Sequence, residues 1–192
     1  FIDERFGDDP SRIQLVRCGH DPSLGGKTIA DLLKTAGQPL TQSATADMVI
    51  ALQLKGGCSA IFHAYDEPDV ERFLQSPFGM IGSDGSLTKL GDGAPHPRAF
   101  GTFPRVLGHY VRERHVLTLE EAIRKMTSFP AARLGLTDRG VLKTGMVADV
   151  TVFDAAAIAD RATFTDPHHY STGVRIVLVN GQVTVANGAH TG

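Results

Sequence analysis

Residues 78–108 of this chain read FGMIGSDGSLTKLGDGAPHPRAFGTFPRVLG, and this stretch decides how the fold is interpreted. It opens with a short apolar run, residues 78–82, of the kind that forms a strand buried on both faces. The run stops at a Ser-Asp-Gly turn that contains Asp84, and a glycine-rich loop then leads to His96 and Arg98. The pattern therefore predicts a carboxylate at the end of a buried strand and a guanidinium at the far end of a flexible loop.

Two more apolar runs, residues 13–18 and 58–65, predict strands earlier in the chain. Apolar residues at helical spacing, with capping and stop signals, predict helices between and after the strands. We expect these helices over 29–36, from about 45 to 56, between Asp66 and Pro77, around 103–111, and from the Thr118 capping box to just before Pro130. Strands that alternate with helices favour an α/β fold of parallel βα units. Three such units cannot close a (β/α)8 barrel of about 250 residues, so they would form its last part or part of an open sheet.

The pattern of the chain changes near residue 141. Residues 147–154 are typical of a strand, and residues 175–179 and 182–186 flank the dipeptide Asn180-Gly181. An Asn-Gly pair supplies the positive φ angles that a two-residue type I′ turn requires, so these residues predict a β-hairpin. We therefore expect the C-terminal segment to be rich in β-structure.

Composition and charge exclude some classes of function. The net charge is −2 without a run of Lys or Arg, so we expect no nucleic-acid partner. No apolar stretch approaches the length of a membrane span, and residues 1–12 lack the pattern of a signal peptide, so we expect a cytoplasmic protein without a membrane partner. Cys18 and Cys58 form neither a disulfide framework nor a Cys-x-x-Cys pair, and we expect two buried free thiols.

Asp84 is the first candidate for a functional residue. In parallel α/β folds the functional groups lie where the strands end, at the C-terminal edge of the sheet. A carboxylate at this edge can ligate a metal ion, accept a proton from water or return a proton to a leaving group. The same residue could instead only cap the turn that follows, and the pattern alone does not favour one role over the other.

Three more residues are candidates for the same edge. Arg98 could hold a carboxylate through two parallel hydrogen bonds, or it could be a surface arginine in a polar loop. His96 could bind a metal ion or substrate, or it could be structural, and His63 could face the same edge or be packed in the interior. The pair His168 and His169 has no third ligand at a suitable spacing, so we interpret it as non-functional.

A series of motifs runs through the chain in a fixed order. They are IGSDG (81–85), HPR (96–98), GTFPRVLGHYVRE (101–113), LTLEEAIRKMTSFPAARLGL (117–136), RGVLKTGMVADVTVFD (139–154) and VLVNGQV (177–183). Together they resemble the C-terminal part of the N-acyl-D-amino-acid deacylases of the amidohydrolase superfamily. The resemblance extends from about Ile13 to the end of the chain, and its SDG, HPR and FPRVLG motifs are the specific ones.

This resemblance implies a fold and a division into domains. Family members are similar to a distorted (β/α)8, TIM-like barrel that holds zinc, joined to a small β-sandwich that both chain ends build. Residues 1–140 would be the C-terminal βα units of the barrel, with an insertion at about 20–57. Residues 141–192 would be the β-rich segment of the sandwich.

The resemblance also implies a reaction and the roles of individual residues. Family members hydrolyse the amide of an N-acyl-D-amino acid to a carboxylate and a free D-amino acid. Asp84 would take a proton from zinc-bound water and deliver it to the leaving amine, and it is also a candidate zinc ligand. Arg98 would hold the α-carboxylate of the substrate, and His96 and His63 are further candidates for substrate binding.

The chain departs from the family in its metal ligands. The family carries a His-x-His pair and other ligands upstream, and no His-x-His occurs in this sequence. We therefore expect zinc in the complete enzyme but no complete zinc site in this chain alone, which would be inactive without the N-terminal portion of the same protein. Two other interpretations stay open: a cyclic-amide hydrolase similar to hydantoinases or dihydroorotases, and a non-catalytic amidohydrolase-like domain.

Overall fold

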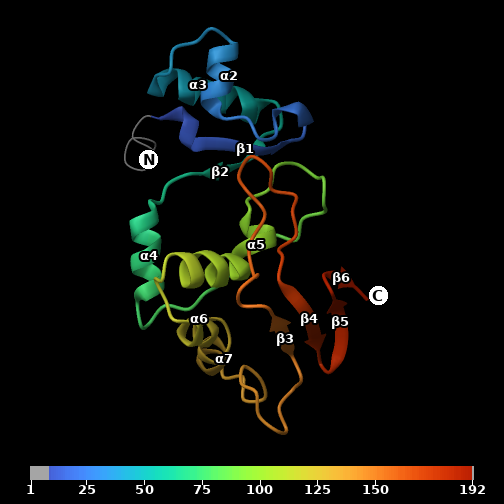
Figure 1. Cartoon of the computed structure of the whole chain (residues 1–192). Coiled ribbons are helices and arrows are strands. Elements are labelled where there is room, and N and C mark those ends of the chain that lie inside the picture. The colour runs from blue at the N-terminus through green and yellow to red at the C-terminus, as the bar shows by residue number, and fades with distance from the viewer. Residues whose placement is uncertain (1–8, 192) are drawn as a thin grey trace. The chain divides into compact units, whose positions relative to one another are not determined.

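The structure, a computed structural model, describes residues 9–191, which form two compact units (Figure 1). The first unit comprises residues 9–66, 87–97 and 163–168, and the second comprises residues 67–86, 98–162 and 169–191. Each unit contains helices and antiparallel strands around a core of its own. No helix in this part of the chain is both long and apolar enough to cross a bilayer. The N-terminal segment used to predict a cytoplasmic location lies, up to Asp8, outside the described residues.

The first unit is built on a two-stranded antiparallel sheet, β1 (Ile13–Cys18) and β2 (Cys58–Phe62). Between the two strands the chain forms the helices α2 (Ile29–Thr35) and α3 (Gln42–Leu54), and short 3₁₀ helices lie at Pro10–Arg12 and Pro22–Leu24. The core consists of buried side chains from β1, α2 and α3: Ile13, Leu15, Cys18, Ile29, Leu33 and Leu52.

The prediction that these strands are parallel is wrong. The register runs from Ile13 opposite Phe62 to Cys18 opposite Cys58, which is an antiparallel pairing. A buried strand reads as an apolar run in either direction, and a long connection that contains helices can join strands of either direction. The sequence pattern could therefore identify the strands without deciding how they pair.

Side-chain caps determine where the helices of the first unit begin. At the start of α2, the Asp31 N–H donates to the Thr28 hydroxyl (3.1 Å) and the Thr28 N–H donates to the Asp31 carboxylate (2.9 Å). This is a reciprocal capping box. The next helix, α3, begins before the predicted start near Thr45, because the Thr41 hydroxyl accepts a backbone N–H of its first turn (3.3 Å).

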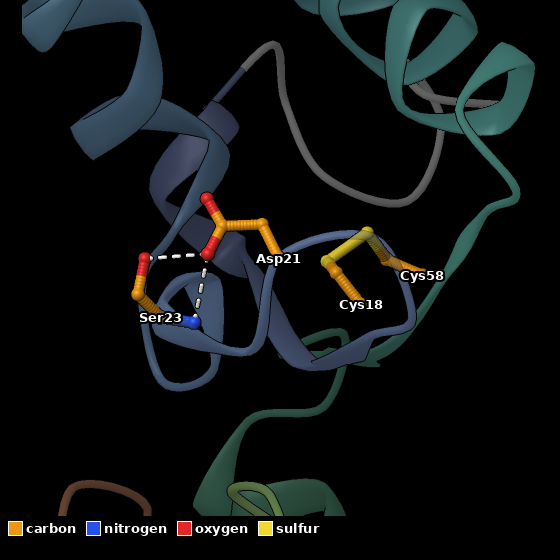
Figure 2. The surroundings of a disulfide bond; sticks show 4 residues. All are labelled: Cys18, Asp21, Ser23 and Cys58. Carbon is orange, nitrogen blue, oxygen red and sulfur yellow. Dashed lines mark hydrogen bonds between the residues drawn. A yellow bond between two sulfur atoms is a disulfide. The ribbon is translucent and has the colours of Figure 1, made fainter.

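Cys18 and Cys58 form a disulfide bond, so the prediction of two free thiols is wrong (Figure 2). The two residues are direct partners in the ladder between β1 and β2, and their Cα atoms are 4.3 Å apart. Cys18 ends β1 and Cys58 begins β2, so the antiparallel register brings them together although 40 residues separate them in sequence. Figure 2 also shows Asp21, whose carboxylate accepts hydrogen bonds from the hydroxyl (2.7 Å) and the N–H (3.0 Å) of Ser23. These hydrogen bonds lower the pKa of Asp21.

Helices form the first part of the second unit. They are α4 (Glu67–Gln75), α5 (Arg98–Arg105), which continues as the π-helix η3 (Val106–Glu113), α6 (Leu119–Met126) and α7 (Ser128–Arg133). The Thr118 hydroxyl caps α6 by accepting the N–H of Glu121 (3.2 Å), which is half of the predicted capping box. The carboxylate of Glu121 holds Arg124 at 2.7 and 2.8 Å. The core of this unit is formed by Val106, Leu107, Tyr110, Ala122 and Ile158.

The strand predicted at residues 78–82 is not formed among the described residues. Residues 79–89 belong to no strand or helix, and the Ile81 N–H donates to the carbonyl of Lys125 near the end of α6 (3.1 Å). A strand exists only where neighbouring strands supply the partners for its backbone. The apolar side chain of Ile81 packs against the core of the second unit.

The C-terminal segment forms a four-stranded antiparallel sheet (Figure 1). Its strands follow the order of the chain: β3 (Val150–Phe153), β4 (Val174–Val179), β5 (Gln182–Ala186) and β6 (Ala189–His190). The predicted hairpin is confirmed between β4 and β5, where Asn180 and Gly181 have φ angles of 50° and 80°. These are the positive angles that a type I′ turn requires.

Candidate active site

Asp84 and Arg98 form an ion pair in which Nη2 of Arg98 lies 2.9 Å from Oδ2 of Asp84. Asp84 follows the irregular segment 79–83, and Arg98 is the first residue of α5. The two ends of the intervening loop therefore come together in the second unit. The side chains of Asp84 and Arg98 are 86% and 44% exposed, so a small molecule can reach both.

The backbone conformation at residues 84 and 85 allows Asp84 to come close to the first turn of α5. The φ angle of Asp84 is 46°, in the left-handed region that Asp tolerates better than most residues with a side chain. A Cβ atom at Gly85 would lie 3.0 Å from the carbonyl oxygen of Arg98 and 3.1 Å from the Cα of Ala99. A side chain at position 85 would therefore press against the first turn of α5, and glycine removes this obstacle.

The two candidate histidines lie against one phenylalanine in the first unit. The ring centroids of His63 and His96 are 4.6 and 4.9 Å from that of Phe164, both in edge-to-face geometry. The buried side chain of Gln14 joins this group, since its amide nitrogen donates to the carbonyl of Phe164 (2.7 Å) and its oxygen lies 3.0 Å from Nε2 of His63. Gln14 and Phe164 could not be identified from the sequence, because they lie 150 positions apart and share no motif with the histidines.

The surroundings of His63 favour its neutral form. Burial, and then the positive charge of Arg12, lower the pKa of His63 below its usual value. Because the Gln14 amide nitrogen is used by Phe164, its oxygen faces His63 and accepts from Nε2–H. A neutral His63 in this tautomer can offer Nδ1 as a hydrogen-bond acceptor.

His168, which the sequence pattern suggested to be non-functional, makes two specific contacts. Its Nδ1 accepts the N–H of Gly91 (3.1 Å), and its Nε2 donates to the carbonyl of Gly93 (2.8 Å). Both glycines belong to the loop that separates the two members of the ion pair in sequence. In the same loop, the Ala94 N–H donates to the carbonyl of Val16 in β1 (2.9 Å). Residues 91–94, which belong to the first unit, are thus held within that unit.

Residues 9–191 contain no group of three or more His, Cys, Asp or Glu side chains placed to hold a metal ion. Asp84 is engaged by Arg98, and both cysteines are in the disulfide. A catalytic zinc ion requires several His, Cys or carboxylate ligands at once. The described residues therefore do not by themselves fit a zinc ion.

The chain belongs to the amidohydrolase family, whose model matches residues 14–185. This membership, together with a structural match to D-aminoacylase, implies a fold of the TIM-barrel type, and the chain itself is mixed helix and strand.

The relatives that match most of this chain are named D-aminoacylase, N-acyl-D-glutamate deacylase and N-acyl-D-aspartate deacylase, which confirms the resemblance drawn from the motifs. It is similar to the D-aminoacylase of Alcaligenes xylosoxydans xylosoxydans, with 43% identity over 94% of this chain and 35% of that protein. A crystal structure of D-aminoacylase matches with 42% identity and a TM-score of 0.82, over 94% of this chain and 36% of that chain. The N-acyl-D-glutamate deacylase of Bordetella bronchiseptica, solved with zinc and a phosphonate mimic of the tetrahedral intermediate, matches with 39% identity and a TM-score of 0.81, over 97% of this chain and 38% of that chain.

The matches also differ in how much of each protein they cover. It spans 35% of the length of the Alcaligenes D-aminoacylase. Dihydroorotases match over a smaller part of the chain: that of Endomicrobium trichonymphae is 33% identical over 50% of this chain and 19% of that protein. The likeness to deacylases is therefore the more extensive of the two.

Proposed function

We propose that this chain is the C-terminal portion of a zinc-dependent N-acyl-D-amino-acid deacylase. The whole protein would hydrolyse the amide to a carboxylate and a free D-amino acid. The observation that carries this proposal is the contact between Asp84 and Arg98, because it places a proton carrier beside a group that binds carboxylates. The D-aminoacylase that matches 94% of this chain supports the proposal.

The proposed domains follow the expected division. Residues 1–140 would supply the last βα units of the barrel with an insertion at about 20–57, and residues 141–192 would belong to a small β-sandwich. The separate core of the first unit supports an inserted segment in this region, and the antiparallel sheet β3–β6 supports the β-rich domain. The remaining barrel strands and the metal ligands would come from the N-terminal portion of the protein.

Asp84 and Arg98 would divide the chemistry between them. Arg98 would bind the α-carboxylate of the substrate through two parallel hydrogen bonds. The substrate carboxylate would thereby replace that of Asp84, which would become available as a base. Asp84 would take a proton from the attacking water and pass it to the amine nitrogen as the C–N bond breaks.

His63 and His96 would be secondary contacts for the substrate. Because Nε2 of His63 is engaged by Gln14, a substrate contact of His63 would use Nδ1. The rings of both histidines lie against Phe164, which limits how they can turn.

Zinc in the whole protein is supported by the Bordetella deacylase, whose structure contains it. The residues of this chain do not complete such a site, so the proposed zinc would be bound mainly by residues from outside the chain. We propose Asp84 as the residue that this chain would contribute to the zinc site.

A panel of substrates tests the proposal on the purified whole protein. We expect hydrolysis of an N-acetyl-D-amino acid with a kcat/KM about 100-fold higher than for its L-enantiomer, its C-terminal amide or a hydantoin. Arg98→Leu should reduce the preference for the acid over its amide towards one, because the group that recognises the carboxylate is lost. Preferential hydrolysis of the hydantoin would favour the cyclic-amide hydrolase, and hydrolysis of none of the compounds would favour a non-catalytic domain.

The proposed cytoplasmic location has a consequence for the disulfide. Disulfides are rare in the reducing cytosol, so a cytoplasmic protein is expected to carry Cys18 and Cys58 as thiols until it is purified in air. Alkylation of intact cells followed by mass spectrometry of the two cysteine peptides measures this state. Two alkylated cysteines would agree with the cytoplasm, whereas an unmodified, bridged pair would indicate an oxidising compartment.

A further inference from the structure

Lys125, in α6, is buried although it carries a charge that the proposed mechanism does not use. Only 1% of its surface is exposed. Lysine is rarely buried to this extent, because its ammonium group loses its hydration and must be compensated by hydrogen bonds or by an opposite charge. The groups that contact the buried ammonium of Lys125 therefore indicate the role of this residue.

The contacts of Lys125 converge on one segment, residues 76–81. Its ammonium group donates to the carbonyl of Ser76 and to that of Gly79 (3.1 Å), and Glu121 supplies a negative charge 3.8 Å away. The backbone carbonyl of Lys125 in turn accepts the N–H of Ile81 (3.1 Å). One residue thus holds both ends of the segment, by its side chain and by its backbone.

Residues 76–81 connect the end of α4 to the residues that precede Asp84. This segment begins directly after α4, where the last carbonyls of a helix lack partners within the helix and favour a cation. It ends three residues before Asp84, whose φ angle of 46° is unusual for a residue with a side chain. Such a conformation persists only where the surrounding structure holds it. On the other side of Asp84, the close approach of Gly85 to the first turn of α5 provides the second fixed point.

We propose that Lys125 is a positioning residue whose ammonium group holds residues 76–81 and so fixes the direction of the Asp84 carboxylate. This inference rests on the proposed function of Asp84. The three N–H donors of lysine suit two carbonyls and one carboxylate in a small space. Methionine has a similar length without any donor, and it would leave both carbonyls without the cation.

Kinetics and backbone exchange test the inference on the whole protein. Lys125→Met should lower kcat for the N-acyl-D-amino acid by about 100-fold, because a displacement of about 1 Å has an effect of this order, and should leave KM within about twofold. Hydrogen exchange measured by mass spectrometry should rise about tenfold in a peptide covering residues 77–86 and stay unchanged in one covering 106–112. Lys125→Arg keeps the charge and the N–H donors, so it should have a kcat and an exchange rate in residues 77–86 close to those of the parent protein. Lys143→Met, the same change at an exposed lysine of the same unit, should alter neither.

Each other outcome opposes the inference. Unchanged kcat in Lys125→Met, or faster exchange throughout the second unit, would mean that Lys125 only fills the core. If Lys125→Met does not fold, Lys125→Leu, which also removes every N–H donor from position 125, should show the same faster exchange in the peptide covering residues 77–86, and parent-like exchange there would overturn the proposal. Hydrogen exchange needs no substrate. If the parent protein fails the deacylase assay but Lys125→Met exchanges faster in residues 77–86, the proposed function is wrong and the anchoring role of Lys125 still holds.

Discussion

Asp84→Asn is expected to lower kcat of the whole protein for N-acyl-D-amino acids by about 10³-fold, since a positioned acid–base group contributes an effect of this order. An amide at position 84 can neither accept the proton of the attacking water nor return it to the amine. We expect KM to stay within about threefold, because Arg98 would still bind the substrate carboxylate. Steady-state measurement of amine release would give both constants.

The substitution is a clean test because it changes little else. Asn has nearly the size of Asp and tolerates the left-handed backbone conformation that position 84 requires. Asp138→Asn is a matched control, since Asp138 also pairs with an arginine, Arg139, at 3.1 Å on an exposed surface of the same unit. That variant should keep the parent kcat. If Asp84→Asn also keeps kcat within about threefold, the assigned role of Asp84 is wrong.

Gly173→Ala is expected to lower the free energy of unfolding by about 3 kcal/mol, which combines the cost of a left-handed alanine with that of overpacking. The φ angle of Gly173 is 86°, and a Cβ atom there would lie 2.5 Å from both the backbone nitrogen and the Cα of Ile158. Ile158 is 2% exposed and belongs to the core of the second unit, so its backbone cannot move without disturbing that core. The midpoint of urea unfolding, followed on the protein that contains this chain, measures the effect.

A second glycine separates the two causes. Gly145 has a similar φ angle of 89°, but no atom lies within 4 Å of a Cβ placed there. Gly145→Ala should therefore cost only about 1 kcal/mol, from the backbone conformation alone. Equal midpoints for the two variants would show that the contact with Ile158 has no energetic effect.

The features that could be predicted from the sequence depend on short-range chemistry. The turn at Asn180-Gly181 and the Thr118 half of the capping box of α6 were predicted correctly, because each is decided by a few neighbouring residues. Family membership could also be predicted, since its motifs are contiguous and occur in order. Asp84 and Arg98 were identified as candidates for the same reason, whereas their direct contact depends on how the loop between them folds back.

The errors in the path and pairing of the chain concern partners that are distant in sequence. An apolar run marks a buried segment, but it does not say which strand lies beside it or in which direction. For this reason the pairing of β1 with β2, the Cys18–Cys58 disulfide and the irregular path of residues 79–83 were not predicted. Sequence by itself determined the family and several local turns and caps, and it supplied the candidate residues for the chemistry. Only the tertiary structure decided which of them meet: Asp84 with Arg98, His63 and His96 with Phe164, and Lys125 with residues 76–81. Long-range contacts depend on the packing of the whole chain, and no local pattern encodes it.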